Sequence, residues 1–82
     1  MKHLFITIEL RSGEDEFDQK TVVEVDDGQD SFEYGLSYVA DFWGNSTDFG
    51  DGWVEYPNGI IGRLKQVSVI SEEDYNVLKR FI

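Results

Sequence analysis

The chain has no cysteine, so neither a disulfide nor a thiolate zinc site can supplement its hydrophobic core. No apolar run approaches the roughly 18 residues with which a helix crosses a bilayer. The beginning, MKHLFITIEL, has neither the apolar segment nor the small-residue cleavage site of a secretory signal peptide. We therefore expect a cytoplasmic protein that is stabilised by packing alone, without a cofactor.

Positive charge is also scarce. Seven Lys and Arg stand against 17 Asp and Glu, which gives a formal net charge of −10. Residues 1–56 carry 14 acids and three bases, whereas residues 57–82 carry three acids and four bases. Because phosphate binding requires Lys and Arg, this imbalance excludes nucleic acid as a direct ligand. A basic protein surface is the partner that such a negative field favours.

The length allows one domain, residues 1–82, near the size at which a single core only just outweighs chain entropy. The composition is 40% hydrophobic and 15% aromatic, which is too apolar for a disordered chain despite the charge. We expect a folded domain whose aromatic side chains supply much of the buried area.

Two strands open the chain. Apolar and polar residues alternate over residues 3–11 and again over residues 21–26, which is the period of a strand with one buried face. The segment between them, SGEDEFDQ at residues 12–19, is polar and holds four acids. This pattern predicts an antiparallel hairpin with a fairly long, acidic connection.

A helix, a turn and a longer strand follow. Bulky residues at spacings of three and four predict a helix over residues 32–42, capped by Asp30 or Ser31 and ended at Gly44. We predict a loop for the segment WGNSTDFGDGW at residues 43–53. A strand over residues 53–56 and a reverse turn at residues 57–59 are expected after it. The apolar pattern of residues 60–70 changes phase, which predicts a bulge near Lys65 and Gln66. Ser71 then resembles the cap of a closing helix.

The expected fold class is α+β, in the order ββαββα. We predict one four-stranded, twisted antiparallel sheet with both helices on one face. The bulky residues expected between the helices and the sheet are Leu4, Ile6, Ile8, Leu10, Val23, Val25, Leu36, Val39, Val67, Val69 and Leu78.

Catalysis has little support. The only histidine, His3, lies near the N-terminus on the polar phase of the first strand, without a Ser–His pattern around it. Asp48 and Asp51, between two tryptophans, could act as an acid and a base on a sugar, but the chain is too short to build a deep cleft around them. Their spacing does not fit an EF-hand. An irregular calcium site at these two residues stays open as an alternative, and we expect neither an enzyme nor a regular metal site.

We expect a small acidic domain that binds proteins. In the sharpest form of this hypothesis it is an inhibitor whose carboxylates imitate the phosphates of nucleic acid and occupy the Lys/Arg groove of a nucleic-acid-binding enzyme. In size and charge only, the chain is similar to the anti-restriction and anti-CRISPR proteins of phages. The alternative is a homodimeric scaffold domain, with exposed aromatic rings in its interface. The candidate partner-binding residues are Glu14, Asp15, Glu16, Asp18, Asp26, Asp27, Asp30, Glu33, Asp41, Trp43, Asp48, Asp51 and Trp53.

Overall fold

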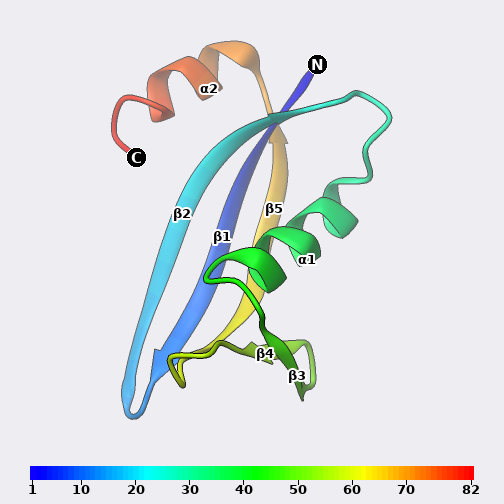
Figure 1. Cartoon of the computed structure of the whole chain (residues 1–82). Helices are drawn as coiled ribbons and strands as arrows, with labels where there is room; N and C mark the ends of the chain where they lie inside the picture. The colour runs from blue at the N-terminus through cyan, green and yellow to red at the C-terminus, as the bar shows by residue number, and fades with distance from the viewer.

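The computed structural model describes all 82 residues and has a single five-stranded antiparallel sheet with two helices (Figure 1). The strands lie in the order β2-β1-β5-β4-β3. The α+β class is as expected, but the prediction of four strands in the order ββαββα is wrong. The elements are β1 (Lys2–Ser12), β2 (Asp15–Val25), α1 (Ser31–Asp41), β3 (Thr47–Gly50), β4 (Trp53–Glu55), β5 (Ile61–Ile70) and α2 (Glu72–Leu78).

The additional strand, β3, lies inside the segment that reads as a loop. It pairs with β4 to form a hairpin that turns at Asp51 and Gly52, whose φ angles are 54° and 85°. Two successive positive φ values define a type I′ turn, whose twist matches that of the flanking strands, and Asp-Gly is a preferred sequence for it. The segment that begins at Trp43 is therefore not a plain connection, and Trp53 is the first residue of the second strand of this hairpin.

The first hairpin is tighter than expected. Ser12 pairs with Asp15, so only Gly13 and Glu14 form the turn, and Gly13 takes a φ of 64°. Glycine at the first of two turn positions suits a type II′ turn. The predicted long connection is wrong, and most of its acids lie on β2 itself.

The predicted bulge in the last strand is confirmed. Thr7 pairs with Gln66 and the next residue, Ile8, pairs with Leu64, which leaves Lys65 as the extra residue. The bulge restores the phase of the apolar pattern. Leu64 before it and Val67 after it consequently pack against the same core.

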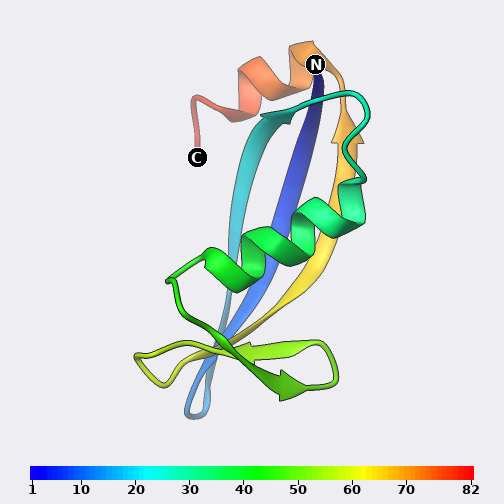
Figure 2. The same ribbon diagram turned by 45° about the vertical axis from the view of Figure 1, so that its right-hand side comes forward.

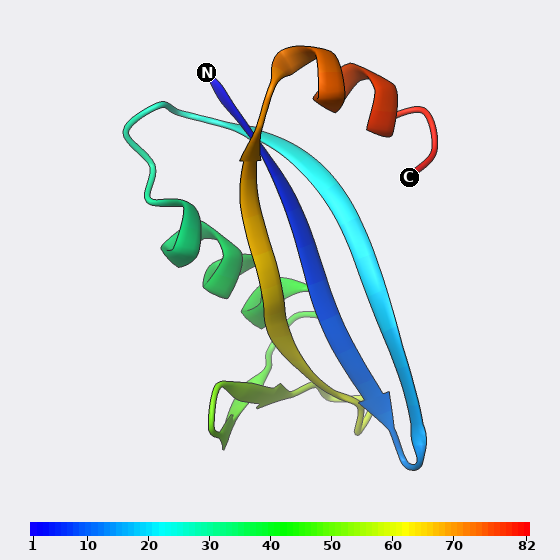
Figure 3. The same ribbon diagram turned by 180° about the vertical axis from the view of Figure 1, so that it is seen from behind.

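The helices lie on opposite faces of the sheet, so the prediction of both on one face is wrong. α1 covers the face that presents the even-numbered residues of β1 from Leu4 to Leu10, all of them buried (Figure 2). α2 lies against the other face, which we call the second face, at the end where the chain begins (Figures 1 and 3). There the ring centroid of Tyr75 lies 4.5 Å from the ring centroid of His3. His3 is one of the β1 residues that alternate with the buried residues Leu4 to Leu10.

α1 also presents a different side to the sheet than the one expected. Gly35 and Val39 are buried, whereas Leu36 is 43% exposed. A Cβ on Gly35 would lie 2.8 Å from Leu64 Cδ2, so the glycine allows α1 to approach β5 closely. Of the other expected core residues, Val69 is 62% exposed near the end of β5, and Leu78 is half-buried.

Tyr56 closes the core between β4 and α1, and its environment predicts an alkaline transition. Its buried hydroxyl donates a hydrogen bond to the Val39 carbonyl. Burial, and then the charge of Tyr38, raise the pKa of Tyr56 from 10.0 to about 12. A tyrosine whose pKa is higher in the folded protein than in the unfolded chain stabilises the fold. This stabilisation is fully present below the unfolded pKa of 10.0, and we expect it to be lost as the pH rises from 10 to 12.

The variant Tyr56→Phe tests this assignment. It removes the hydrogen bond, and we expect it to lower the free energy of unfolding by about 1 kcal/mol at pH 7. The difference from the native protein should shrink between pH 10 and pH 12, as urea titrations at each pH would show. A difference that stays constant across this range would contradict the assignment.

Candidate partner-binding surface

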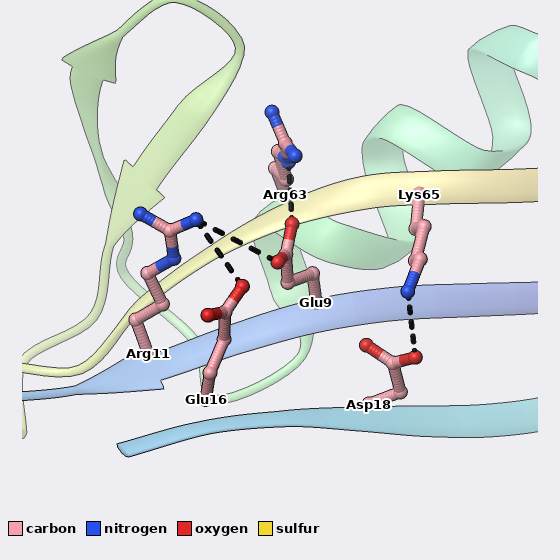
Figure 4. Close-up of polar contacts among 6 residues, drawn as sticks. All are labelled: Glu9, Arg11, Glu16, Asp18, Arg63 and Lys65. Atoms are coloured by element: carbon pink, nitrogen blue, oxygen red, sulfur yellow. Dashed lines mark hydrogen bonds and ion pairs between the residues drawn. The ribbon is translucent and has the colours of Figure 1, made fainter. Parts of the chain in front are cut away.

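A charge network of six side chains from β1, β2 and β5 lies on the second face (Figure 4). At its centre is Glu9 of β1, whose side chain is 7% exposed. Arg63 Nε on β5 donates to Glu9 Oε1 at 2.7 Å. Arg11, two residues along β1, lies 3.8 Å from the other Glu9 oxygen and donates to Glu16 of β2 at 3.2 Å. Three neighbouring strands are thereby joined through side chains.

The bulge and the second hairpin extend this network. Because the bulge lies at Lys65, this residue reaches across β1 to Asp18 of β2, where Nζ donates to Oδ2 at 2.9 Å. The hydrogen bond with Asp18, and then its charge, raise the pKa of Lys65. On β4, the ring centroid of Trp53 lies 4.7 Å from the guanidinium carbon of Arg11 and 4.7 Å from that of Arg63. Such contacts between cations and rings are attractive.

Glu9 is ionised in this setting, which predicts a loss of stability in acid. The neighbouring carboxyl of Glu16 is the largest influence that lowers the pKa of Glu9, burial opposes it, and Arg63 and Arg11 lower the pKa further. A carboxyl whose pKa is lower in the folded protein than in the unfolded chain stabilises the fold at pH values above its ordinary pKa of 4.5. This stabilisation is lost as the pH falls through the pKa of the folded protein. We expect Glu9→Gln to be less stable than the native protein at pH 7, with a gap that narrows below pH 4.5. Thermal melts across this pH range measure it, and a gap that widens in acid would contradict the assignment.

The candidate acids lie at several separate places and do not form one continuous row. One group is on β2 and at its two ends, a second is on or next to α1, and a third is on the β3–β4 hairpin. In that order the groups are Glu14, Asp15, Glu16, Asp18, Asp26 and Asp27; Asp30, Glu33 and Asp41; and Asp48 and Asp51. Since β2 and β3 are the two edges of the sheet, the first and third groups lie on opposite edges.

Local cations neutralise part of the first group. Glu16 and Asp18 belong to the network described above, and Asp27 lies 3.3 Å from the N-terminal amine. The remaining candidate acids have no ion pair, although the carboxylates of Asp30 and Asp48 accept hydrogen bonds from the backbone N–H groups of Glu33 and Gly50. The candidate acids without an ion pair are Glu14, Asp15, Asp26, Asp30, Glu33, Asp41, Asp48 and Asp51.

The aromatic residues of the central segment divide between packing and exposure. Tyr56 is buried, and Trp53 is half-buried beside the two arginines. Trp43 is 41% exposed and packs against Tyr56 in a T-shaped arrangement, with 5.2 Å between the ring centroids. Phe49 on the edge strand β3 is 56% exposed. Of the two candidate tryptophans, Trp43 is the one accessible to a partner.

The acids are spread out with respect to metal binding. No three His, Asp or Glu side chains come together in a group that could hold a metal ion, and the carboxylate of Asp48 accepts a hydrogen bond from the backbone N–H of Gly50.

No protein family, curated protein or solved structure matches this chain. Neither helix has the length and apolar character that crossing a membrane requires. The function therefore has to be inferred from the charge and the edges of this sheet.

Proposed function

We propose that this chain is a non-catalytic, cytoplasmic domain that binds a basic protein. The observation that carries the proposal is the charge along β2 and its two ends. Residues 14–27 contain seven acids and a single base, Lys20. Local cations neutralise some of these acids, but Glu14, Asp15 and Asp26 have none, and all three are exposed. A dense negative edge of this kind accelerates encounter with cationic partners and orients them.

In the narrower form that we propose, the domain is an inhibitor of a nucleic-acid-binding enzyme. The groove of such an enzyme is lined by Lys and Arg that contact phosphates. Carboxylates along the 37 Å length of this molecule, on β2 and on α1, would take the place of those phosphates. The separate groups of acids support a mimic that contacts a basic groove at several points.

A salt-stepped capture experiment tests the proposal. The domain is immobilised, exposed to a cell extract at low ionic strength, and eluted in steps of rising salt. We expect basic proteins in the later steps, and we expect nucleic-acid-binding enzymes among them if the narrower form holds. The double variant Glu14→Lys and Asp26→Lys should lose them. Equal recovery by the variant, or elution that does not depend on salt, would contradict the proposal.

A homodimeric scaffold is a second candidate, and the exposed rings favour it. Phe32, Trp43 and Phe49 all present a large part of their surface to solvent. Burial of these rings between two copies would be nearly independent of salt. Sedimentation equilibrium separates the two candidates: a dimer that persists from low to high salt supports the scaffold, and a monomer at all salt concentrations removes it.

A further inference from the structure

β2 is a long edge strand with one unpaired side. Its eleven residues pair with β1 without a register shift, and no strand lies on its other side (Figure 3). It contains no proline, which is one of the devices that prevent edge pairing. The opposite edge, β3, has four residues and an irregular register, so it offers a much shorter template.

The hairpin geometry determines which backbone groups of β2 face outward. In a two-residue hairpin the closing pair, here Ser12 and Asp15, exchanges both hydrogen bonds, and such pairs alternate with pairs that do not. Every second residue of β2 therefore directs its N–H and C=O away from β1. These residues are Glu16, Asp18, Lys20, Val22 and Glu24, and their side chains all lie on the second face.

The charge of β2 selects what can pair with it. Two copies joined along β2 would bring together two edges that each carry seven acids and one base over residues 14–27. Like charges on adjacent strands are destabilising, and such charges are a means by which edge strands avoid self-association. An extended segment rich in Lys or Arg meets the opposite condition, because the edge keeps an excess of acids even though Glu16 pairs with Arg11 and Asp18 with Lys65.

We propose that an extended basic segment of the partner binds along β2 as a sixth strand of the sheet. Main-chain hydrogen bonds provide the affinity in this mode, and alternate side chains provide the specificity. The proposal rests on the proposed function, because it names the part of the basic partner that this edge recognises. It predicts cationic side chains on every second residue of that segment, opposite the acids of the second face.

Synthetic peptides test the mode of binding without changing the protein. The first probe is a fluorescent ten-residue peptide that alternates lysine and threonine. The second has the same sequence with N-methyl groups on every second residue, which removes the donors along one edge and leaves the charge unchanged. We expect the methylated peptide to bind about tenfold more weakly or worse, which corresponds to about 1.4 kcal/mol. Equal binding of the two peptides would overturn the proposal.

A matched pair of variants tests the edge from the protein side. Lys20→Pro and Lys20→Gln both remove the one base of this edge, but only proline removes an outward N–H. Charge alone predicts that both variants bind the lysine peptide at least as tightly as the native protein. We expect Lys20→Gln to do so and Lys20→Pro to bind about tenfold more weakly than Lys20→Gln. Thermal melts of both variants show whether the proline has left the sheet folded.

Hydrogen exchange gives a readout that does not depend on either variant. In the free protein the outward amides of β2, such as those of Asp18 and Lys20, should exchange rapidly. They should become protected when the lysine peptide binds. Binding that weakens with salt but protects none of these amides would overturn the strand addition and leave the acidic docking function intact. No binding of the peptide at low salt would contradict both.

Discussion

Replacing Gly62 by alanine lowers the free energy of unfolding by about 1–3 kcal/mol, because β5 has no room for a side chain at this position. An added Cβ would lie 2.8 Å from Leu10 Cδ2 and 3.0 Å from both Cε2 and the hydroxyl oxygen of Tyr56. Leu10 and Tyr56 are themselves buried, so neither can move aside without disturbing its other contacts. For a domain of this size the melting temperature should fall by roughly 4 °C or more.

Gly28→Ala is the matched control for this prediction. Gly28 is exposed, its φ is not in the left-handed region, and an added Cβ would have no neighbour within 4 Å. Its alanine variant should be as stable as the native protein or up to about 1 kcal/mol more stable, since alanine restricts the unfolded chain. Urea denaturation of both variants provides the measurement. Equal stability of Gly62→Ala and Gly28→Ala would show that the contacts of Gly62 do not constrain the core.

Reversing the charge of Glu14 and Asp26 together slows association with the alternating lysine peptide by about ten- to a hundredfold at low salt. Both acids are exposed at the ends of β2 and have no ion pair. Their replacement by lysine therefore changes the field of this edge without breaking a contact of the charge network. Reversal of Glu16 would be a poorer test, because it would also release Arg11. Stopped-flow measurements at several salt concentrations give the association rates, and the difference should diminish as salt increases.

The double variant Glu55→Lys and Glu73→Lys makes the same change in net charge at another place. Glu55 lies on β4 and Glu73 on α2; both are exposed, and neither has an ion pair. We expect this control to slow association much less than the change at the ends of β2. Equal slowing by the two double variants would mean that net charge alone attracts the peptide, without a preferred edge.

Features that depend on neighbouring residues could be predicted from the sequence. The alternation in β1, the Asp30 cap of α1 and the bulge at Lys65 each follow from a few consecutive side chains. The strand β3 was missed because Asp and Gly are poor strand formers and only four residues pair. The Asp51–Gly52 pair was nevertheless a usable signal, since it predicts a type I′ hairpin between the residues on either side.

The charge network could not be predicted in the same way. Its members are ordinary polar residues on the phase of each strand that faces away from α1. The Arg63–Glu9 contact joins positions 54 residues apart, and the Lys65–Asp18 contact joins positions 47 residues apart. Both contacts require β5 to lie beside β1, and this strand order does not follow from any local pattern.

By itself the sequence determined the excess of negative charge, the period of the long strands and the ends of the helices, because each depends on composition or on residues adjacent in the chain. The tertiary structure decided which acids are neutralised, which tryptophan lies against arginines and which strand is left at the edge. It also placed the helices on opposite faces. These outcomes depend on the order and register of strands that are distant in sequence, where small differences in packing free energy select one arrangement.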